Sequence, residues 1–199
     1  DSAEGILECF KHVLKEFGYP PKDDRTIYNT IGMTLVDAFD LLTDMPDNPQ
    51  REDMRKAYVK KADEVMVKKT YFYDDTIAIL QTLQNAGVKV GIVSTKYRYR
   101  IVNTFNEQAG SLPVDIIVGG EDVTRAKPDP QGLDLIIERF GADKSDVLYI
   151  GDSYIDAETA LNSGVDFAGV TTGSTTKEDF EKYPHIYIGS SLLDIFQNI

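Results

Sequence analysis

The chain has 199 residues, with 21 basic and 33 acidic side chains and a formal net charge of −12 at pH 7. This acidic balance, without a basic stripe, argues against nucleic-acid binding and against attachment to an anionic membrane. A single cysteine, Cys9, excludes an intramolecular disulfide and fits a reducing compartment. The apolar runs are too short to span a membrane, so we expect a cytoplasmic protein with no membrane partner.

Residues 1 to about 70 carry only helical patterns. The first stretch has an apolar stripe at helical spacing, which ends at Gly18 and Pro20. Two further helical stretches follow, and Pro46 and Pro49 separate them. We therefore predict a helical domain over residues 1–70. The stripe of the first stretch consists of Ile6, Leu7, Phe10, Val13, Leu14 and Phe17.

From about residue 72 the pattern changes to short apolar strands that alternate with helices. This alternation predicts an α/β domain with a doubly wound parallel sheet over residues 71–199. In such a sheet, ligands bind beyond the carboxyl ends of the strands, so the residues that follow each strand are the candidate site. The predicted strands are 88–93, 114–118, 147–150, 165–170 and 186–188.

Hydroxyl groups follow the strand predicted at 88–93. Ser94 and Thr95 come directly after it, where hydroxyls and the free N–H groups of a helix start can bind phosphate oxygens. Lys127 lies in a Lys-Pro-Asp-Pro run, and its charge would offset that of a phosphate. Taken singly, such hydroxyls are more often helix caps, and such a lysine is more often a surface residue. Their combination at strand ends favours a phosphate site.

Two carboxylates follow the strand predicted at 147–150. Asp152 and Asp156 are four residues apart, so they share one face of the helix that begins there. Magnesium binds through one or two carboxylates together with phosphate and water, so this pair is a candidate metal site. The competing interpretation makes Asp152 the N-cap of the helix and Asp156 a solvated carboxylate.

These segments together resemble the motifs of the haloacid dehalogenase superfamily. The run Gly-Ile-Val-Ser-Thr-Lys at 91–96 resembles its second motif, and Lys-Pro-Asp-Pro at 127–130 resembles its third. The run Gly-Asp-Ser-Tyr-Ile-Asp at 151–156 resembles its fourth. The best match is the phosphoglycolate phosphatase and pyrophosphatase branch. Residues 1–70 are similar to the helical cap of that branch, and 71–199 to its Rossmann-like core.

The resemblance implies a role for each matching residue. Ser94 would hydrogen-bond the transferring phosphoryl group, and Thr95 would help through its backbone or hydroxyl. Lys127 would stabilise the phosphate and the nucleophile. Asp152 would bind Mg²⁺ directly, and Asp156 would bind it directly or through an intervening group.

The family's first motif, which carries the nucleophilic aspartate, has no counterpart in residues 1–199. Asp1 and Ser2 resemble the tail of that motif, and Asp1 is better interpreted as a helix cap than as a nucleophile. In the family, the first strand lies between the strands predicted here at 88–93 and 147–150. Because adjacent strands lie about 4.8 Å apart, its absence would leave a gap of roughly twice that width. We therefore expect the first core strand and the nucleophile upstream of Asp1.

The function implied by the resemblance is Mg²⁺-dependent hydrolysis of a small phosphomonoester, with phosphoglycolate as the first choice, through an aspartyl-phosphate. Alternatives within the superfamily are an inorganic pyrophosphatase and a sugar-phosphate mutase. An alternative from another class is a catalytically inactive binding module. The expected partner is a small phosphorylated metabolite, not a nucleic acid, and the protein is expected to be a monomer or homodimer.

Overall fold

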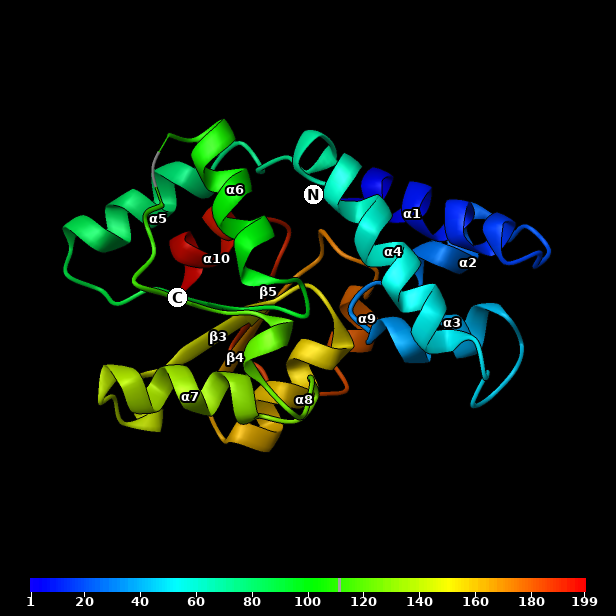
Figure 1. The fold of residues 1–199 in the computed structure, drawn as a ribbon. Coiled ribbons are helices and arrows are strands. Elements are labelled where there is room, and N and C mark those ends of the chain that lie inside the picture. The colour runs from blue at the N-terminus through cyan, green and yellow to red at the C-terminus, as the bar shows by residue number, and fades with distance from the viewer. Residues whose placement is uncertain (111) are drawn as a thin grey trace. The chain divides into compact units, whose positions relative to one another are not determined.

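The computed structural model describes residues 1–110 and 112–199, which form two compact units (Figure 1). The first unit contains Asp1–Phe72 and Val102–Gly110, and the second contains Tyr73–Ile101 and the described residues from 112 onward. The change of unit after Phe72 lies close to the predicted boundary at residue 70. The grouping of 102–110 with the first unit was not predicted from the sequence, and the assignment of cap and core domains stays a prediction.

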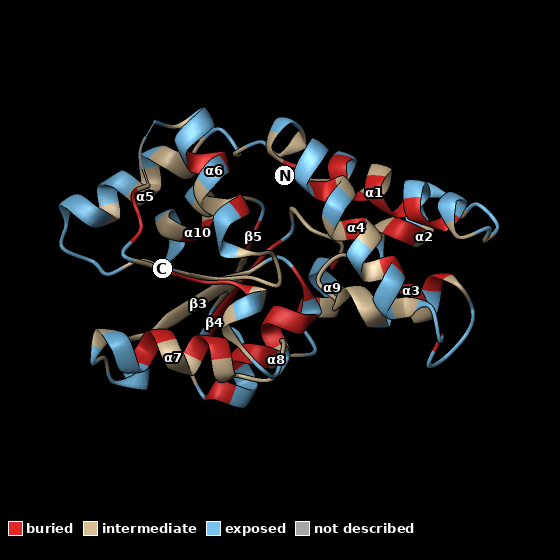
Figure 2. Cartoon of the chain, in the orientation of Figure 1, coloured by how far each residue is buried: buried red, intermediate tan, exposed pale blue. Residues whose placement is uncertain are grey.

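The first unit is helical. Buried positions recur along α1, α3 and α4 (Figure 2). At its centre, Phe10 packs against Phe39 and Tyr58, with ring centroids 5.1 and 4.8 Å apart respectively. Four positions of the stripe predicted for the first helix are buried here, and Leu7 and Phe17 pack against the core. The elements are α1 (Ala3–Glu16), α2 (Asp24–Tyr28), α3 (Leu35–Leu42), α4 (Arg51–Val65), the 3₁₀ turn η1 (Val67–Lys69) and most of α6 (Arg98–Gln108).

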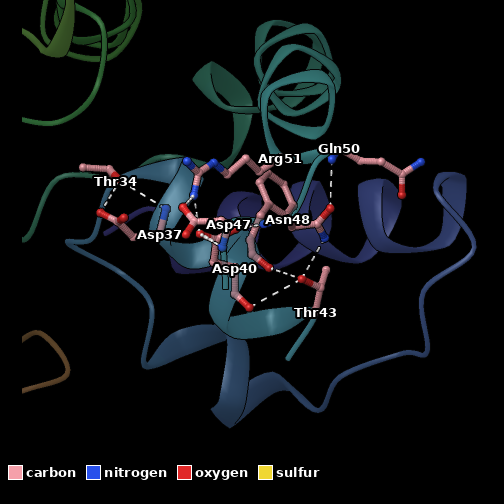
Figure 3. Close-up of polar contacts among 9 residues, drawn as sticks. Thr34, Asp37, Asp40, Thr43, Asp47, Asn48, Gln50 and Arg51 are labelled. Carbon is pink, nitrogen blue, oxygen red and sulfur yellow. Dashed lines mark hydrogen bonds and ion pairs between the residues drawn. The ribbon is translucent and has the colours of Figure 1, made fainter. Parts of the chain in front are cut away.

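The connection between α3 and α4 is organised around a buried amide (Figure 3). The Asn48 side chain is only 1% exposed, and its Nδ2 donates to the hydroxyls of Thr43 and Tyr19, each at 2.9 Å. Its Oδ1 accepts from the Gln50 backbone N–H at 2.9 Å. The Asp40 carboxylate accepts from the Asn48 backbone N–H at 3.0 Å. These bonds satisfy the polar groups of a turn that would otherwise be costly to bury.

The second unit alternates strands and helices, as the sequence predicted. Helices α7 and α8 cover one face of its strands, and α10 packs on the other (Figure 1). The elements are α5 (Thr76–Asn85), β1 (Gly91–Val93), β2 (Ile116–Val118), η2 (Gly120–Asp122), α7 (Gln131–Phe140), η3 (Lys144–Asp146), β3 (Leu148–Gly151), α8 (Tyr154–Ser163), β4 (Asp166–Val170), α9 (Lys177–Phe180), β5 (Tyr187–Gly189) and α10 (Leu192–Asn198).

The strands alternate their side chains between two apolar layers. Phe167 packs with Ala157 and Ala160 of α8, whereas its neighbour Ala168 packs with Ile195 of α10. This period of two is what a strand buried on both faces requires. All described strand pairs are parallel, which confirms the predicted α/β fold class.

Strand β1 is shorter than the predicted strand at 88–93. Val88 donates its N–H to the carbonyl of Leu83 and so belongs to the turn after α5. Val90 donates its N–H to the Asp115 side chain instead of to a neighbouring backbone carbonyl. The regular ladder therefore begins only at Gly91.

The described strands form two sheets, β1–β2 and β3–β4–β5. Among the described residues, β1 and β3 are not paired with each other, and both are only partly buried. The first core strand expected from the resemblance would lie between these two, and this expectation stays a prediction. Within the described ranges, every helix is too short or too polar to cross a bilayer.

Candidate functional site

The carboxylate of Asp156 accepts four hydrogen bonds at the start of α8. Lys127 Nζ and the Tyr149 hydroxyl donate to its Oδ1, at 2.5 and 2.9 Å. The Ser153 hydroxyl and backbone N–H donate to its Oδ2, at 2.6 and 3.1 Å. An ionised carboxylate offers about four lone-pair positions, so these donors occupy them all. Asp156 is 4% exposed, and the arrangement fixes both its position and that of Lys127.

Residues 151–156 favour this arrangement through contacts within the segment. Ser153 is the N-cap of α8, and its side chain accepts from the Asp156 backbone N–H while Asp156 bonds back to the Ser153 N–H. This reciprocal capping box satisfies two N–H groups of the helix start. A Cβ added at Gly151 would lie 2.8 Å from Asp156 Oδ2, so only glycine leaves room for this carboxylate. The cap is therefore Ser153, and the interpretation of Asp152 as the N-cap is wrong.

Lys127, Asp156 and Tyr149 control one another's ionisation. Burial acts against the charge of Lys127, but Asp156 and Tyr149 outweigh it and raise the pKa of the lysine above its ordinary value. Burial likewise opposes the charge of Asp156, yet Lys127 and Ser153 hold the pKa of that carboxyl below its usual range. Burial and the charge of Asp156 raise the pKa of Tyr149. At neutral pH the group is thus an ion pair with a neutral tyrosine.

The pKa of Asp152 is shifted in the direction opposite to that of Asp156. Asp152 follows β3 directly and is exposed, but the surrounding protein atoms desolvate its carboxyl and, with the charge of Asp156, raise its pKa. Lys127 and Lys96 act in the other direction. The Asp152 carboxylate also accepts a hydrogen bond from its own backbone N–H. Because the residue is exposed, this carboxylate is accessible to a ligand.

The loop after β1 carries Ser94, Thr95 and Lys96. The Ser94 N–H donates to the Val118 carbonyl at 3.0 Å, and the Ser94 hydroxyl oxygen accepts from the Lys96 N–H at 3.1 Å. The Gly120 N–H donates to the Lys96 carbonyl at 3.0 Å. Burial, aided by the charge of Arg100, lowers the pKa of Lys96 to about 8, although Asp152 acts in the other direction.

The structure therefore brings Lys127, Asp152 and Asp156 together, and the charge interaction between Lys96 and Asp152 links the Ser94–Lys96 loop to them. The predicted roles all stay predictions: catalysis and substrate binding by Ser94 and Lys127, substrate binding by Thr95, and metal binding by Asp152 and Asp156. Sequence reasoning missed Tyr149, whose place in an apolar strand gave no sign of its bond to Asp156. It also missed Gly173, which lies against Asp152 from a loop 21 residues further along the chain.

The residues present fit a magnesium ion that shares its coordination with substrate. Across residues 1–110 and 112–199, no group of three or more acidic, histidine or cysteine side chains is placed to hold a metal by itself. Mg²⁺ commonly uses one or two carboxylates and takes its other ligands from water and phosphate. Asp152, with its accessible carboxylate, suits that role. Asp156, whose lone pairs are all occupied, is better suited to hold Lys127.

Comparisons with known proteins agree with the motifs. The chain is 25% identical over 194 residues to the pyrophosphatase PpaX of Listeria monocytogenes, covering 96% of this chain and 87% of that protein. It is 27% identical over 184 residues to the N-acetylmuramic acid 6-phosphate phosphatase of Pseudomonas aeruginosa, and the match covers 90% of this chain and 80% of that protein.

A crystal structure of a haloacid dehalogenase-like hydrolase from Bacteroides fragilis superposes with a TM-score of 0.93 at 46% identity, covering 96% of this chain and 91% of that one. The family model of the haloacid dehalogenase-like hydrolases matches residues 1–170. The resemblance inferred from the three motifs is thereby confirmed: the chain belongs to the haloacid dehalogenase-like hydrolase family.

Proposed function

We propose that the protein is an Mg²⁺-dependent phosphatase that hydrolyses a small phosphomonoester. The observation that carries the proposal is the largely buried Lys127–Asp156 ion pair beside the accessible carboxylate of Asp152. Phosphoryl transfer depends on positioning and on neutralising charge that develops on the phosphate oxygens. A fixed cation and a carboxylate available to a hard metal ion supply those two needs within one cluster.

Each residue has a distinct task in this proposal. Lys127 stays protonated, because Asp156 and Tyr149 favour its charge, and offsets the charge of the phosphate and of the attacking carboxylate. Asp152 binds Mg²⁺, which supplies charge stabilisation when bound. Ser94 and Thr95 orient the phosphoryl oxygens from the loop after β1. The reaction follows the aspartyl-phosphate route that the family resemblance implies.

Phosphoglycolate is the proposed first substrate, and pyrophosphate is the second. Pyrophosphate is favoured by the name of the PpaX relative, which matches 96% of this chain. The name of the Pseudomonas relative adds a sugar phosphate, N-acetylmuramic acid 6-phosphate, to the set worth testing. Hydrolysis of each of them transfers a phosphoryl group, which is the group that the proposed cluster would bind.

The test is hydrolysis of these three substrates and of p-nitrophenyl phosphate by the full-length natural protein, with Mg²⁺ or with EDTA. We expect turnover with Mg²⁺, its loss in EDTA and its loss in Asp152→Asn. The matched control is Asp166→Asn, which makes the same change at an exposed aspartate at the start of β4.

Turnover that survives both EDTA and Asp152→Asn would contradict the proposal. Phosphate-dependent Mg²⁺ binding without turnover of any substrate would favour the inactive binding module. Transfer of the phosphoryl group between positions of a sugar, in place of its release, would favour the mutase.

A further inference from the structure

The loop between β4 and α9, residues 171–176, lies against the backbone and the carboxyl group of Asp152. A Cβ added at Gly173 would lie 2.8 Å from both Cγ and Oδ2 of Asp152, and would collide with the Asp152 carbonyl oxygen. The backbone of Gly173 is outside the left-handed region, so its backbone conformation is one that alanine can also adopt. The absence of a side chain at position 173 is therefore required by the close approach to Asp152 and not by the backbone conformation.

The same loop also contacts Tyr154, the residue that follows Ser153. The Thr175 hydroxyl oxygen accepts a hydrogen bond from the Tyr154 backbone N–H at 2.8 Å, and Thr175 is buried. Tyr154 is the first residue of α8, where the backbone N–H groups have no partner within the helix. Gly173 and Thr175 thus fix the chain immediately before and after Ser153.

The two carboxylates of the cluster are oriented by different means. Asp156 is held by four hydrogen bonds. Asp152 is held more loosely: its carboxylate accepts from its own backbone N–H and is attracted by the charges of Lys127 and Lys96, so packing against its neighbours adds to what orients it. The backbone of Gly173 lies so close to this carboxylate that a Cβ at position 173 would overlap it.

We propose that the β4–α9 loop positions the Asp152 carboxylate, with Gly173 as the positioning residue whose close approach restricts its direction and Thr175 as the residue that anchors the following turn. The link to Mg²⁺ rests on the function proposed above. The packing of Gly173 on Asp152 does not depend on it. Residues that orient a metal ligand without touching the metal commonly have large effects on affinity, which makes the loop testable.

The variants are Gly173→Ala, which adds one methyl group against Asp152, and Thr175→Val, which keeps the shape but removes the acceptor for Tyr154. Ser174→Ala is the matched control within the same loop. Mg²⁺ affinity is measured by calorimetry on the full-length protein, without substrate. We expect Gly173→Ala to weaken Mg²⁺ binding about 10- to 100-fold and Ser174→Ala to change it less than about twofold. Thr175→Val should weaken it by a smaller factor than Gly173→Ala.

A second measurement separates this proposal from the proposed function. The ¹³Cγ chemical shift of Asp152 is recorded in metal-free protein at fixed pH. If this chemical shift changes in Gly173→Ala but not in Ser174→Ala, the positioning role is supported. Absence of Mg²⁺ binding by the wild type would refute only the metal assignment and would leave that result standing. An unchanged Asp152 signal in Gly173→Ala, or wild-type Mg²⁺ affinity in that variant, overturns the positioning role. If Gly173→Ala does not fold, unchanged affinity and spectrum in Thr175→Val overturn it.

Discussion

Tyr149 offers the sharpest test of the hydrogen bonds around Asp156. The substitution Tyr149→Phe removes a single hydroxyl group and keeps the ring, which packs against the ring of Phe167 with the two ring centroids 6.5 Å apart. Asp156 Oδ1 then keeps only Lys127 as a donor, while Oδ2 keeps both bonds from Ser153. The substitution removes the hydrogen bond to Asp156 and the interaction of the same hydroxyl with Lys127, and leaves the other donors in place.

The expected cost follows from that bond. It is 2.9 Å long and ends on an ionised carboxylate that is 4% exposed. Hydrogen bonds to charged groups contribute about 1.5–3 kcal/mol, so we expect Tyr149→Phe to lower the free energy of unfolding by about 2 kcal/mol. The loss should carry over to activity, because Lys127 is held by the same carboxylate oxygen.

The matched control is Tyr183→Phe. The Tyr183 hydroxyl also donates to a carboxylate, that of Glu158, at 3.0 Å, but Glu158 lies at a partly exposed position where water replaces the lost bond. We expect a loss of about 0.5 kcal/mol there. Urea unfolding followed by circular dichroism measures both variants. Equal losses in the two variants would refute the conclusion that Asp156 is held by a buried, charge-assisted network.

Three further predictions test other parts of the structure. Gly151→Ala should destabilise the protein by about 1–3 kcal/mol and reduce phosphatase activity, because its methyl group collides with Asp156; thermal unfolding and a phosphate-release assay would show it. Asn48→Ala should lower the free energy of unfolding by about 2–3 kcal/mol, because it removes three hydrogen bonds made by a buried side chain; unchanged urea unfolding would rule out this role. Asp156 has a lowered pKa in the fold, so the stability that its charge provides is complete above the unfolded pKa of about 3.9 and is lost as the pH falls through the folded pKa. The stability difference between wild type and Asp156→Asn should therefore shrink on acidification below about pH 4, and a difference that grows there would contradict the ion pair.

The sequence predicted the parts of the fold that depend on local periodicity. The stripe of the first helix is buried, and the alternation of strands and helices produces parallel strands. The strand predicted at 88–93 was too long, because apolar character at Val88 and Val90 does not reveal that a turn and the Asp115 side chain take their N–H groups.

The candidate site was predictable where spacing alone places residues together. Asp152 and Asp156 could be assigned to one helix start from their separation of four. Their different roles could not, because the four donors to Asp156 come partly from Lys127 and Tyr149, which are distant in sequence. Gly173 was missed for the same reason, since its contact with Asp152 exists only after β4 pairs with β3.

The pairing of Lys127 with Asp156 also affects how the binding of Mg²⁺ and the binding of phosphate depend on each other. The two charges cancel, and Lys96, mostly protonated at pH 7 with a pKa of about 8, balances Asp152. These four side chains thus have no net charge, so a phosphate gains little attraction from them until a divalent cation is present. We expect Mg²⁺ and phosphate to bind cooperatively, each strengthening the affinity of the protein for the other by the same factor, as thermodynamic linkage requires.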